Sequence, residues 1–314
     1  MKKLSDKYKW AIILFLTGLG VGLIFSALKR DVSIEAQVET ALVEKEADIG
    51  IISEDEVSDP KHSNPDQGES NLNKEPDSNL PDDLSHPLTK GPYVAIVVDD
   101  LGFSYARAKE LSTINLSLTW AIIPFQNASR QTADLAKEKG IPFLVHIPMQ
   151  AFGDKDGGAY LVGLSMGDEE IKRNVKRAIE SLPGAIGANN HRGSAATSNM
   201  RVMRAAMEGL KETGLSVFLD SRTAASSVAA LEAKRAGLLA FENGAFIDHL
   251  DDVNFMWSQL RRAAGLAKRR GYIVAICHVR PATLVFLNQL ASSPDAGVKF
   301  VTLEELACLL SASR

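Results

Sequence analysis

The chain has 314 residues, 45% of them hydrophobic, which is enough for one large domain or two small ones with an ordinary core. The formal net charge of −4 is unevenly distributed, with +5 on residues 1–30, −12 on residues 31–90 and +3 on residues 91–314. So small a charge on the last region gives no basic patch, and the chain has no zinc-finger, helix-turn-helix or RNA-binding signature. We therefore expect no nucleic-acid partner.

Residues 1–30 are predicted to be an N-terminal membrane anchor. Residues 10–28 carry no charge and are rich in Ile, Leu, Phe and Val, and as a helix they would span about 28 Å, just the core of a bilayer. Lysines precede this run, so the positive-inside rule predicts a single-pass protein of the cytoplasmic membrane with its C-terminal domain on the extracytoplasmic (periplasmic) side. A cleaved signal peptide is the alternative, but the run is longer than the usual apolar region of about 7–15 residues and no clear A-x-A site follows.

Residues 31–90 are predicted to be an acidic, disordered linker. They combine excess acids with Ser, Asn and Pro and have almost no aromatic residues, a composition that buries too little apolar surface to fold. A flexible chain of this length spans about 45 Å on average. We expect it to be a spacer between membrane and domain.

Residues 91–314 show short apolar runs that alternate with amphipathic stretches. The runs predict strands at 93–98, 117–123, 142–146, 185–188, 215–219, 245–247, 272–277 and 299–301. The stretches predict helices at 128–139, 169–182, 198–213, 226–235, 253–270, 282–289 and 303–310. Glycines end three of these helices, at Gly140, Gly214 and Gly271. Such alternation predicts a parallel α/β sheet, open or closed into a barrel, with its active site at the carboxyl ends of the strands.

Polar residues end most of the apolar runs. All four histidines of residues 91–314 lie at or next to predicted strand ends, together with acids and asparagines: Asp99, Asp100, His146, Asn189, Asn190, His191, Asp220, Asp248, His249 and His278. Carboxylates and imidazoles on one sheet edge suit a divalent transition metal such as zinc, with three protein ligands and an open position. A structural role for any single histidine, and a turn or helix cap for the two adjacent aspartates, are the alternatives.

Other catalytic signatures are missing from the chain. It contains no G-x-S-x-G, no G-x-x-x-x-G-K-[ST], no H-E-x-x-H and no G-x-G-x-x-G after a strand. Cys277 and Cys308 both lie in apolar settings, so we expect two buried, inert thiols, with a disulfide between them as the alternative.

The segment 97–102, Val-Val-Asp-Asp-Leu-Gly, resembles the first motif of polysaccharide deacetylases, a strand that ends in Asp-Asp-Gly. Four later segments resemble the divergent polysaccharide deacetylase family in order: His-Ile-Pro-Met at 146–149, Asn-Asn-His-Arg-Gly-Ser at 189–194, Asp-Ser-Arg-Thr at 220–223 and Cys-His-Val-Arg-Pro at 277–281. The resemblance covers Pro92 to the C-terminus. It implies an irregular (β/α) barrel and deacetylation of a carbohydrate.

By the same resemblance, Asp99 is expected to be the general base and His278 the general acid. The expected metal ligands are Asp100, His146 and His191, and the expected metal is a divalent ion such as zinc. Asn190, Asp220, Arg222 and Asp248 are expected to support these groups or to bind substrate, with structural ion pairs as the alternative for the last three.

The chain also departs from the family pattern. The mainstream motif has a second histidine at the position of Gln150, where the divergent family usually has Glu. The third mainstream motif, of the Arg-Pro-Pro-Tyr type, is absent, and Cys277 stands where Gly is expected. These departures leave the substrate open and put activity in question.

Three functions are consistent with these residues. The leading hypothesis is a zinc-dependent deacetylase of an envelope glycan such as peptidoglycan. The first alternative is a non-catalytic envelope protein that keeps the fold and binds glycan or a protein partner. The second is a phosphoester hydrolase with two metals held by Asp99, Asp100 and Asp248.

Overall fold

The computed structural model describes residues 91–155, 159–294 and 296–312. The predicted membrane anchor and acidic linker lie outside these residues. Within the described ranges, no helix is both long enough and apolar enough to cross a membrane.

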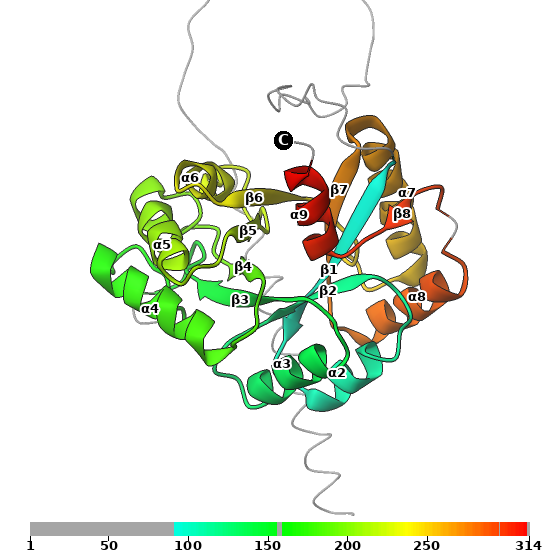
Figure 1. The fold of residues 1–314 in the computed structure, drawn as a ribbon, viewed down its shortest axis with the longest axis horizontal. Coiled ribbons are helices and arrows are strands. Elements are labelled where there is room, and N and C mark those ends of the chain that lie inside the picture. Colours follow the sequence, from blue (N-terminus) through cyan, green and yellow to red (C-terminus); the bar gives the residue numbers. More distant parts are fainter. Residues whose placement is uncertain (1–90, 156–158, 295, 313–314) are drawn as a thin grey trace, which may run out of the picture. The chain divides into compact units, whose positions relative to one another are not determined.

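Seven parallel strands of the described chain form a closed ring (Figure 1). The first strand closes it, because β1 (Tyr93–Leu101) pairs with β2 on one side and β7 on the other. The other strands of the ring are β2 (Leu118–Ile122), β3 (Phe143–Met149), β4 (Gly187–Arg192), β5 (Val217–Asp220), β6 (Leu239–Phe246) and β7 (Tyr272–His278). A short strand, β8 (Lys299–Phe300), pairs with the first two residues of β1. Of the two predicted arrangements, open sheet or barrel, the barrel is the one formed.

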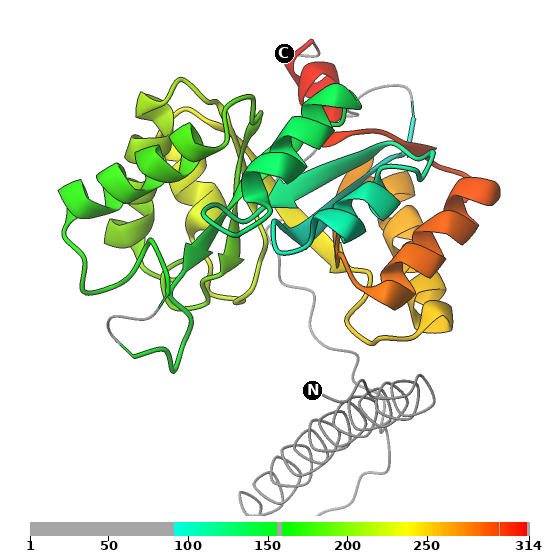
Figure 2. The same ribbon diagram turned by 90° about the horizontal axis from the view of Figure 1, so that it is seen from below.

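Most helices lie outside the ring and cover the strands, as two perpendicular views show (Figures 1 and 2). They are α2 (Tyr105–Leu111), α3 (Ser129–Glu138), α4 (Asp168–Ser181), α5 (Met200–Glu212), α6 (Ala229–Arg235), α7 (Val253–Arg270) and α8 (Pro281–Ser292). The last helix, α9 (Leu303–Ser311), lies near the centre of the ring in Figure 1.

The barrel interior is apolar at the end where the strands begin. Alternate residues of β1, among them Ala95 and Val97, belong to a buried cluster that contains side chains from most strands of the ring and the apolar face of α9. The N–H of Leu303 at the start of α9 donates to Thr119 Oγ1 of β2 at 2.8 Å. Helix α9 thus closes the amino-terminal end of the barrel and leaves the carboxyl-terminal end open to form a site.

The predicted elements agree with the structure except at a few positions. The predictions missed α2, a seven-residue helix capped by Ser104, and began β6 too late, because Glu242 and Asn243 interrupt its apolar pattern. Strands β1, β3 and β4 also continue through the polar residues that we took as strand ends.

The two cysteines differ in burial. Cys277 is buried as predicted, but the prediction of a buried Cys308 was wrong, because this residue is exposed. Its neighbours Leu306 and Leu310 occupy the side of α9 that packs into the barrel, so Cys308 falls on the opposite side.

Candidate active site

A pocket of about 350 Å³ lies at the carboxyl ends of the strands, within the range of roughly 300–1,000 Å³ typical of small-molecule sites. Its residues come from β1, β3, β4, β6, β7 and the segments that follow the strands: Asp99, Asp100, His146, Asn190, His191, Arg192, Ser221, Thr223, Phe246, Asp248, His249, His278 and Arg280. The site therefore lies where a parallel barrel was expected to have it.

The two adjacent aspartates of β1 both face the pocket because the strand is irregular there. Adjacent side chains of a regular strand point to opposite faces, but Asp100 has a φ of 65°, and the pairing of β1 with β2 shifts register between Val98 and Leu101. Asp tolerates this left-handed conformation better than most residues. The distortion brings both carboxylates within 3.5 Å of the same imidazole, that of His146.

The glycine of the same motif has a steric role. Gly102 has a φ of 116°, and a Cβ at this position would lie 2.8 Å from the carbonyl oxygen of Ile123. Only glycine fits this close approach of the segments that follow β1 and β2.

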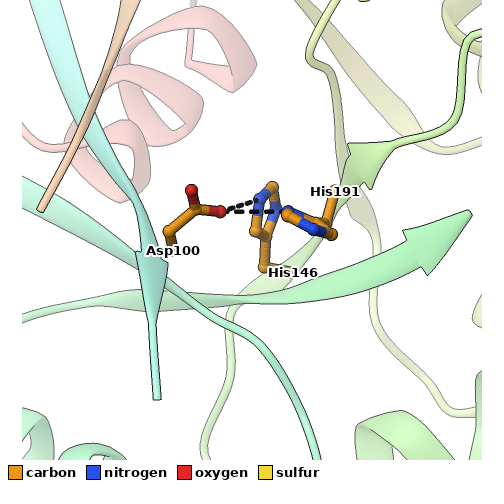
Figure 3. Close-up of side chains that lie close together, drawn as sticks. All are labelled: Asp100, His146 and His191. Atoms are coloured by element: carbon orange, nitrogen blue, oxygen red, sulfur yellow. Dashed lines mark hydrogen bonds and ion pairs between the residues drawn. The ribbon is translucent and has the colours of Figure 1, made fainter. Parts of the chain in front are cut away.

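Asp100, His146 and His191 form a compact group of possible metal ligands (Figure 3). Asp100 Oδ1 lies 3.3 Å from His146 Nε2 and 3.0 Å from His191 Nδ1, and one donor atom from each residue lies within 4.8 Å of the others. Ligands about 2.1 Å from a tetrahedral zinc ion would be separated by roughly 3.4 Å. Two nitrogens and one carboxylate oxygen at these separations fit zinc with an open fourth position.

Asn189 fixes the orientation of the His146 ring through a hydrogen bond to Nδ1. The His146 Nδ1–H donates to Asn189 Oδ1 at 2.9 Å, which leaves Nε2 directed at the two aspartates. Asn189 Nδ2 in turn donates to Asp99 Oδ1 at 3.0 Å and lies 3.3 Å from Ser221 Oγ. One fully buried amide therefore holds both the imidazole and the neighbouring carboxylate.

Asn189 was expected at a strand end but without a role in the site, although a signal for that role was available. His191 lies two residues later on the same strand, and residues two apart share a face. Asn190 has the intermediate position. Its amide instead accepts the Ser221 N–H at 2.9 Å and donates to the Arg192 carbonyl at 2.7 Å, so it joins the ends of β4 and β5.

Burial affects the two aspartates differently. Asp99 is 2% exposed, and this burial raises its pKa even though His146 and His278 act in the opposite direction. Burial acts the same way on Asp100, but hydrogen bonds from His146 and His191 outweigh it and lower its pKa. The two neighbouring carboxyl groups therefore differ in proton affinity, which is raised for Asp99 and lowered for Asp100.

His278 at the end of β7 is held by Asp248. The His278 Nδ1–H donates to Asp248 Oδ1 at 2.9 Å, and its backbone N–H donates to Oδ2 at 2.7 Å. Thr283 Oγ1 also donates to Oδ2, at 3.0 Å, and the ring of Phe246 stacks on the imidazole. Burial disfavours the charged imidazole, but the hydrogen bond and charge of Asp248 outweigh it and raise the pKa of His278. His278 is thus suited to carry and donate a proton.

Asp220 and Arg222 shape a loop and do not line the pocket. The Asp220 carboxylate accepts from the Arg222 N–H at 2.8 Å and from Ser227 Oγ at 2.7 Å. Arg222 donates to the carbonyl of Ser227, and its nearest carboxylate in the described chain is that of Glu242, at 3.7 Å. Ser221 and Thr223 line the pocket instead. Both belong to the family-like segment 220–223, but no role had been predicted for either.

The two residues that differ from the divergent family pattern, Gln150 and Cys277, lie outside the pocket lining. The side chain of Gln150 is buried, and its Oε1 accepts the Leu164 N–H at 2.7 Å, so it fixes the chain between β3 and α4. Cys277 packs in the layer between strands and helices. Gln150 therefore supports the segment after β3 by a hydrogen bond, and Cys277 contributes to the core.

Both carboxylate oxygens of Asp248 already accept hydrogen bonds, one from the ring of His278 and the other from its backbone N–H and from Thr283. Within the described ranges, the group of Asp100, His146 and His191 is the one set of possible ligands that lie close enough together. This geometry does not favour a two-metal hydrolase.

Comparisons with known proteins agree with this geometry. The profile of a family described as divergent polysaccharide deacetylase matches residues 96–307. YibQ of Escherichia coli K12 is 31% identical over 230 residues, 73% of this chain and 70% of YibQ. A protein of Haemophilus influenzae Rd is 34% identical over 198 residues, 62% of this chain and 69% of that protein. A crystal structure from Agrobacterium tumefaciens C58 has a TM-score of 0.64 at 18% identity, covers 69% of this chain and 90% of its own, and shows a shared fold.

Proposed function

Because the chain belongs to the divergent polysaccharide deacetylase family, we propose that residues 91–314 form a metal-dependent hydrolase that removes acetyl groups from a carbohydrate of the bacterial envelope, such as peptidoglycan. One observation carries the proposal. A buried carboxylate, a group of three metal-ligand side chains and a carboxylate-held imidazole meet in one pocket at the open end of the barrel.

Asp100, His146 and His191 would hold the metal, for which zinc is the best fit to the donor set. When bound, such an ion supplies Lewis acidity: it polarises a carbonyl and lowers the pKa of water. Asn189 keeps Nε2 of His146 free for this role by taking the proton of Nδ1 into a hydrogen bond.

Asp99 and His278 would move the protons. Asp99 would accept a proton from the water molecule whose oxygen forms the new bond to the acetyl carbon. His278, with Nδ1 engaged by Asp248, would donate the proton of Nε2 to the sugar nitrogen or oxygen as its bond to the acetyl carbon breaks. The products are acetate and the free amine or hydroxyl.

Elemental analysis and acetate release test this proposal on the full-length protein. We expect one equivalent of zinc and release of acetate from peptidoglycan. Asp99→Asn is the matched variant, because it removes the base and keeps the three ligands; it should retain zinc and lose activity. Zinc without acetate release from any envelope glycan would support the non-catalytic alternative, and absence of bound metal would contradict the assignment of the ligands.

We also propose that residues 1–30 anchor the protein in the cytoplasmic membrane and that residues 31–90 tether the domain on the periplasmic side. The uncharged run at 10–28 and the lysines before it support this orientation. A reporter that works only outside the cytoplasm, fused after Arg314, should be active. Activity of a cytoplasm-only reporter at the same position would contradict the orientation.

A further inference from the structure

Arg280 lines the pocket and has no carboxylate partner among the described residues. It is exposed and lines the pocket two residues after His278. Its guanidinium donates to the backbone carbonyl of Asp248 at 3.2 Å, and it forms no ion pair with any described residue. Arg192, the other arginine of the pocket, is paired with Asp154 Oδ1 at 2.7 Å.

The remaining charges of the pocket can be balanced within it. Asp248 is paired with His278, and a divalent cation held by Asp100 and the two ligand histidines would balance both Asp99 and Asp100. The positive charge of Arg280 is then not balanced by a negative charge within the pocket. Since its backbone hydrogen bond uses one nitrogen, the guanidinium keeps further N–H groups for a planar, two-oxygen anion.

The rest of the lining favours recognition by polar groups. Ser221, Thr223 and Asn190 provide hydroxyl and amide groups suited to sugar hydroxyls. The pocket has one phenyl ring, that of Phe246, and this ring is already stacked on His278. A guanidinium in the same pocket as these neutral groups suits a sugar that also carries an anion.

We propose that the substrate is an acidic amino sugar whose carboxylate binds Arg280 while its acetyl group lies at Asp99 and the metal ligands. This inference rests on the proposed function and adds the chemical class of the substrate. It makes Arg280 a residue that determines specificity, with no part in the proton transfers.

The test compares N-acetylmuramic acid with N-acetylglucosamine, two sugars that differ by the lactyl group that bears the carboxylate. Equilibrium binding of each is measured on the zinc-loaded full-length protein. We expect tighter binding of the acidic sugar, and Arg280→Gln should reduce this preference by about 10- to 100-fold, the range for losing one charge-assisted contact. Arg280→Lys keeps the charge and should retain part of the preference. Arg261→Gln, an exposed arginine of α7, should change neither affinity.

The outcomes separate this inference from the proposed function. Equal binding of the two sugars by the unaltered protein, or an undiminished preference in Arg280→Gln, overturns the role of Arg280. Acetate release is followed in parallel. A preference for the acidic sugar without acetate release would support the role of Arg280 in binding and contradict deacetylation. Acetate release from both sugars, with equal binding of the two, would support deacetylation and contradict the role of Arg280.

Discussion

The two ends of the barrel differ in the side chains that fill them. At the amino-terminal end, α9 inserts Leu303 and Leu306 into the interior, and its start carries a capping box of Thr302 and Glu305. At the carboxyl-terminal end, the interior holds acids, imidazoles and amides in a hydrogen-bonded network. The closed end has the features of a stabilising core, and the open end has those of a site for chemistry.

Backbone strain follows the same division. In the described part of the chain, four residues other than glycine have a positive φ: Asp100, Phe125, Arg192 and Arg222. Each lies at or just after the carboxyl end of a strand, namely β1, β2, β4 and β5. Such conformations cost about 1–3 kcal/mol each and persist where the surrounding structure enforces them. Packing at the closed end and in the outer layer therefore offsets the free-energy cost of the strained residues at the open end.

The largest effect on activity is expected from removing a metal ligand. His146→Ala and His191→Ala should each lose bound zinc and activity, because each removes one of three donor side chains. Affinity for zinc should fall by more than about 100-fold, the upper range for losing only an outer partner of a ligand. Metal titration with a competing chelator measures this. Full zinc binding in either variant would contradict the ligand set.

The next largest effect is expected from His278→Ala. It should lower turnover by about 10²- to 10⁴-fold, the usual range for losing a general acid, and leave zinc content and fold unchanged, because His278 is not part of the ligand group. Steady-state kinetics and elemental analysis of the same sample check both parts. If zinc is lost as completely as in the ligand variants, His278 is a ligand, and His249, which also lines the pocket, becomes the next candidate for the acid.

A smaller effect, with a specific pH signature, is expected from Asp248→Asn. Burial disfavours protonated His278 while Asp248 raises its pKa, so loss of this charge should lower the pKa. The acid form is then lost at a lower pH, and the alkaline limb of the rate profile should move to lower pH. The acid limb, governed by Asp99, should stay in place. An unchanged alkaline limb would show that His278 does not set it.

The smallest effect on activity is expected at the closed end. Leu306→Ala should reduce the free energy of unfolding by about 2–5 kcal/mol, since Leu306 is fully buried, and leave turnover per bound zinc unchanged. Cys308→Ala, on the exposed side of the same helix, should change neither quantity. Denaturant titration and kinetics measure the two effects. A large loss of turnover in Leu306→Ala would show that the ends are coupled.

Much of the fold could be read from the sequence because buried parallel strands form apolar runs that differ clearly from helical patterns. Side-chain directions at the open end were harder to predict. Strand alternation alone would send Asp100 away from the pocket, and its positive φ is a product of tertiary structure. Asn189 and Asn190 are adjacent and chemically identical, so only the strand boundaries distinguish which one faces His146. The roles of Asp99 and His278 in catalysis stay predictions.

Because β1 pairs with β7, the barrel can close only after the last strand of the ring has been made. Val98 of the first strand pairs with Cys277 of the last strand of the ring, and such distant contacts slow folding because a long loop must close first. A growing chain that has not reached β7 keeps one edge of β1 unpaired, and free strand edges promote association with other chains. The proposed metal ligands come from β1, β3 and β4, whereas His278 comes from β7. Synthesis therefore supplies the proposed ligands early, and the proposed proton donor only with the strand that closes the barrel.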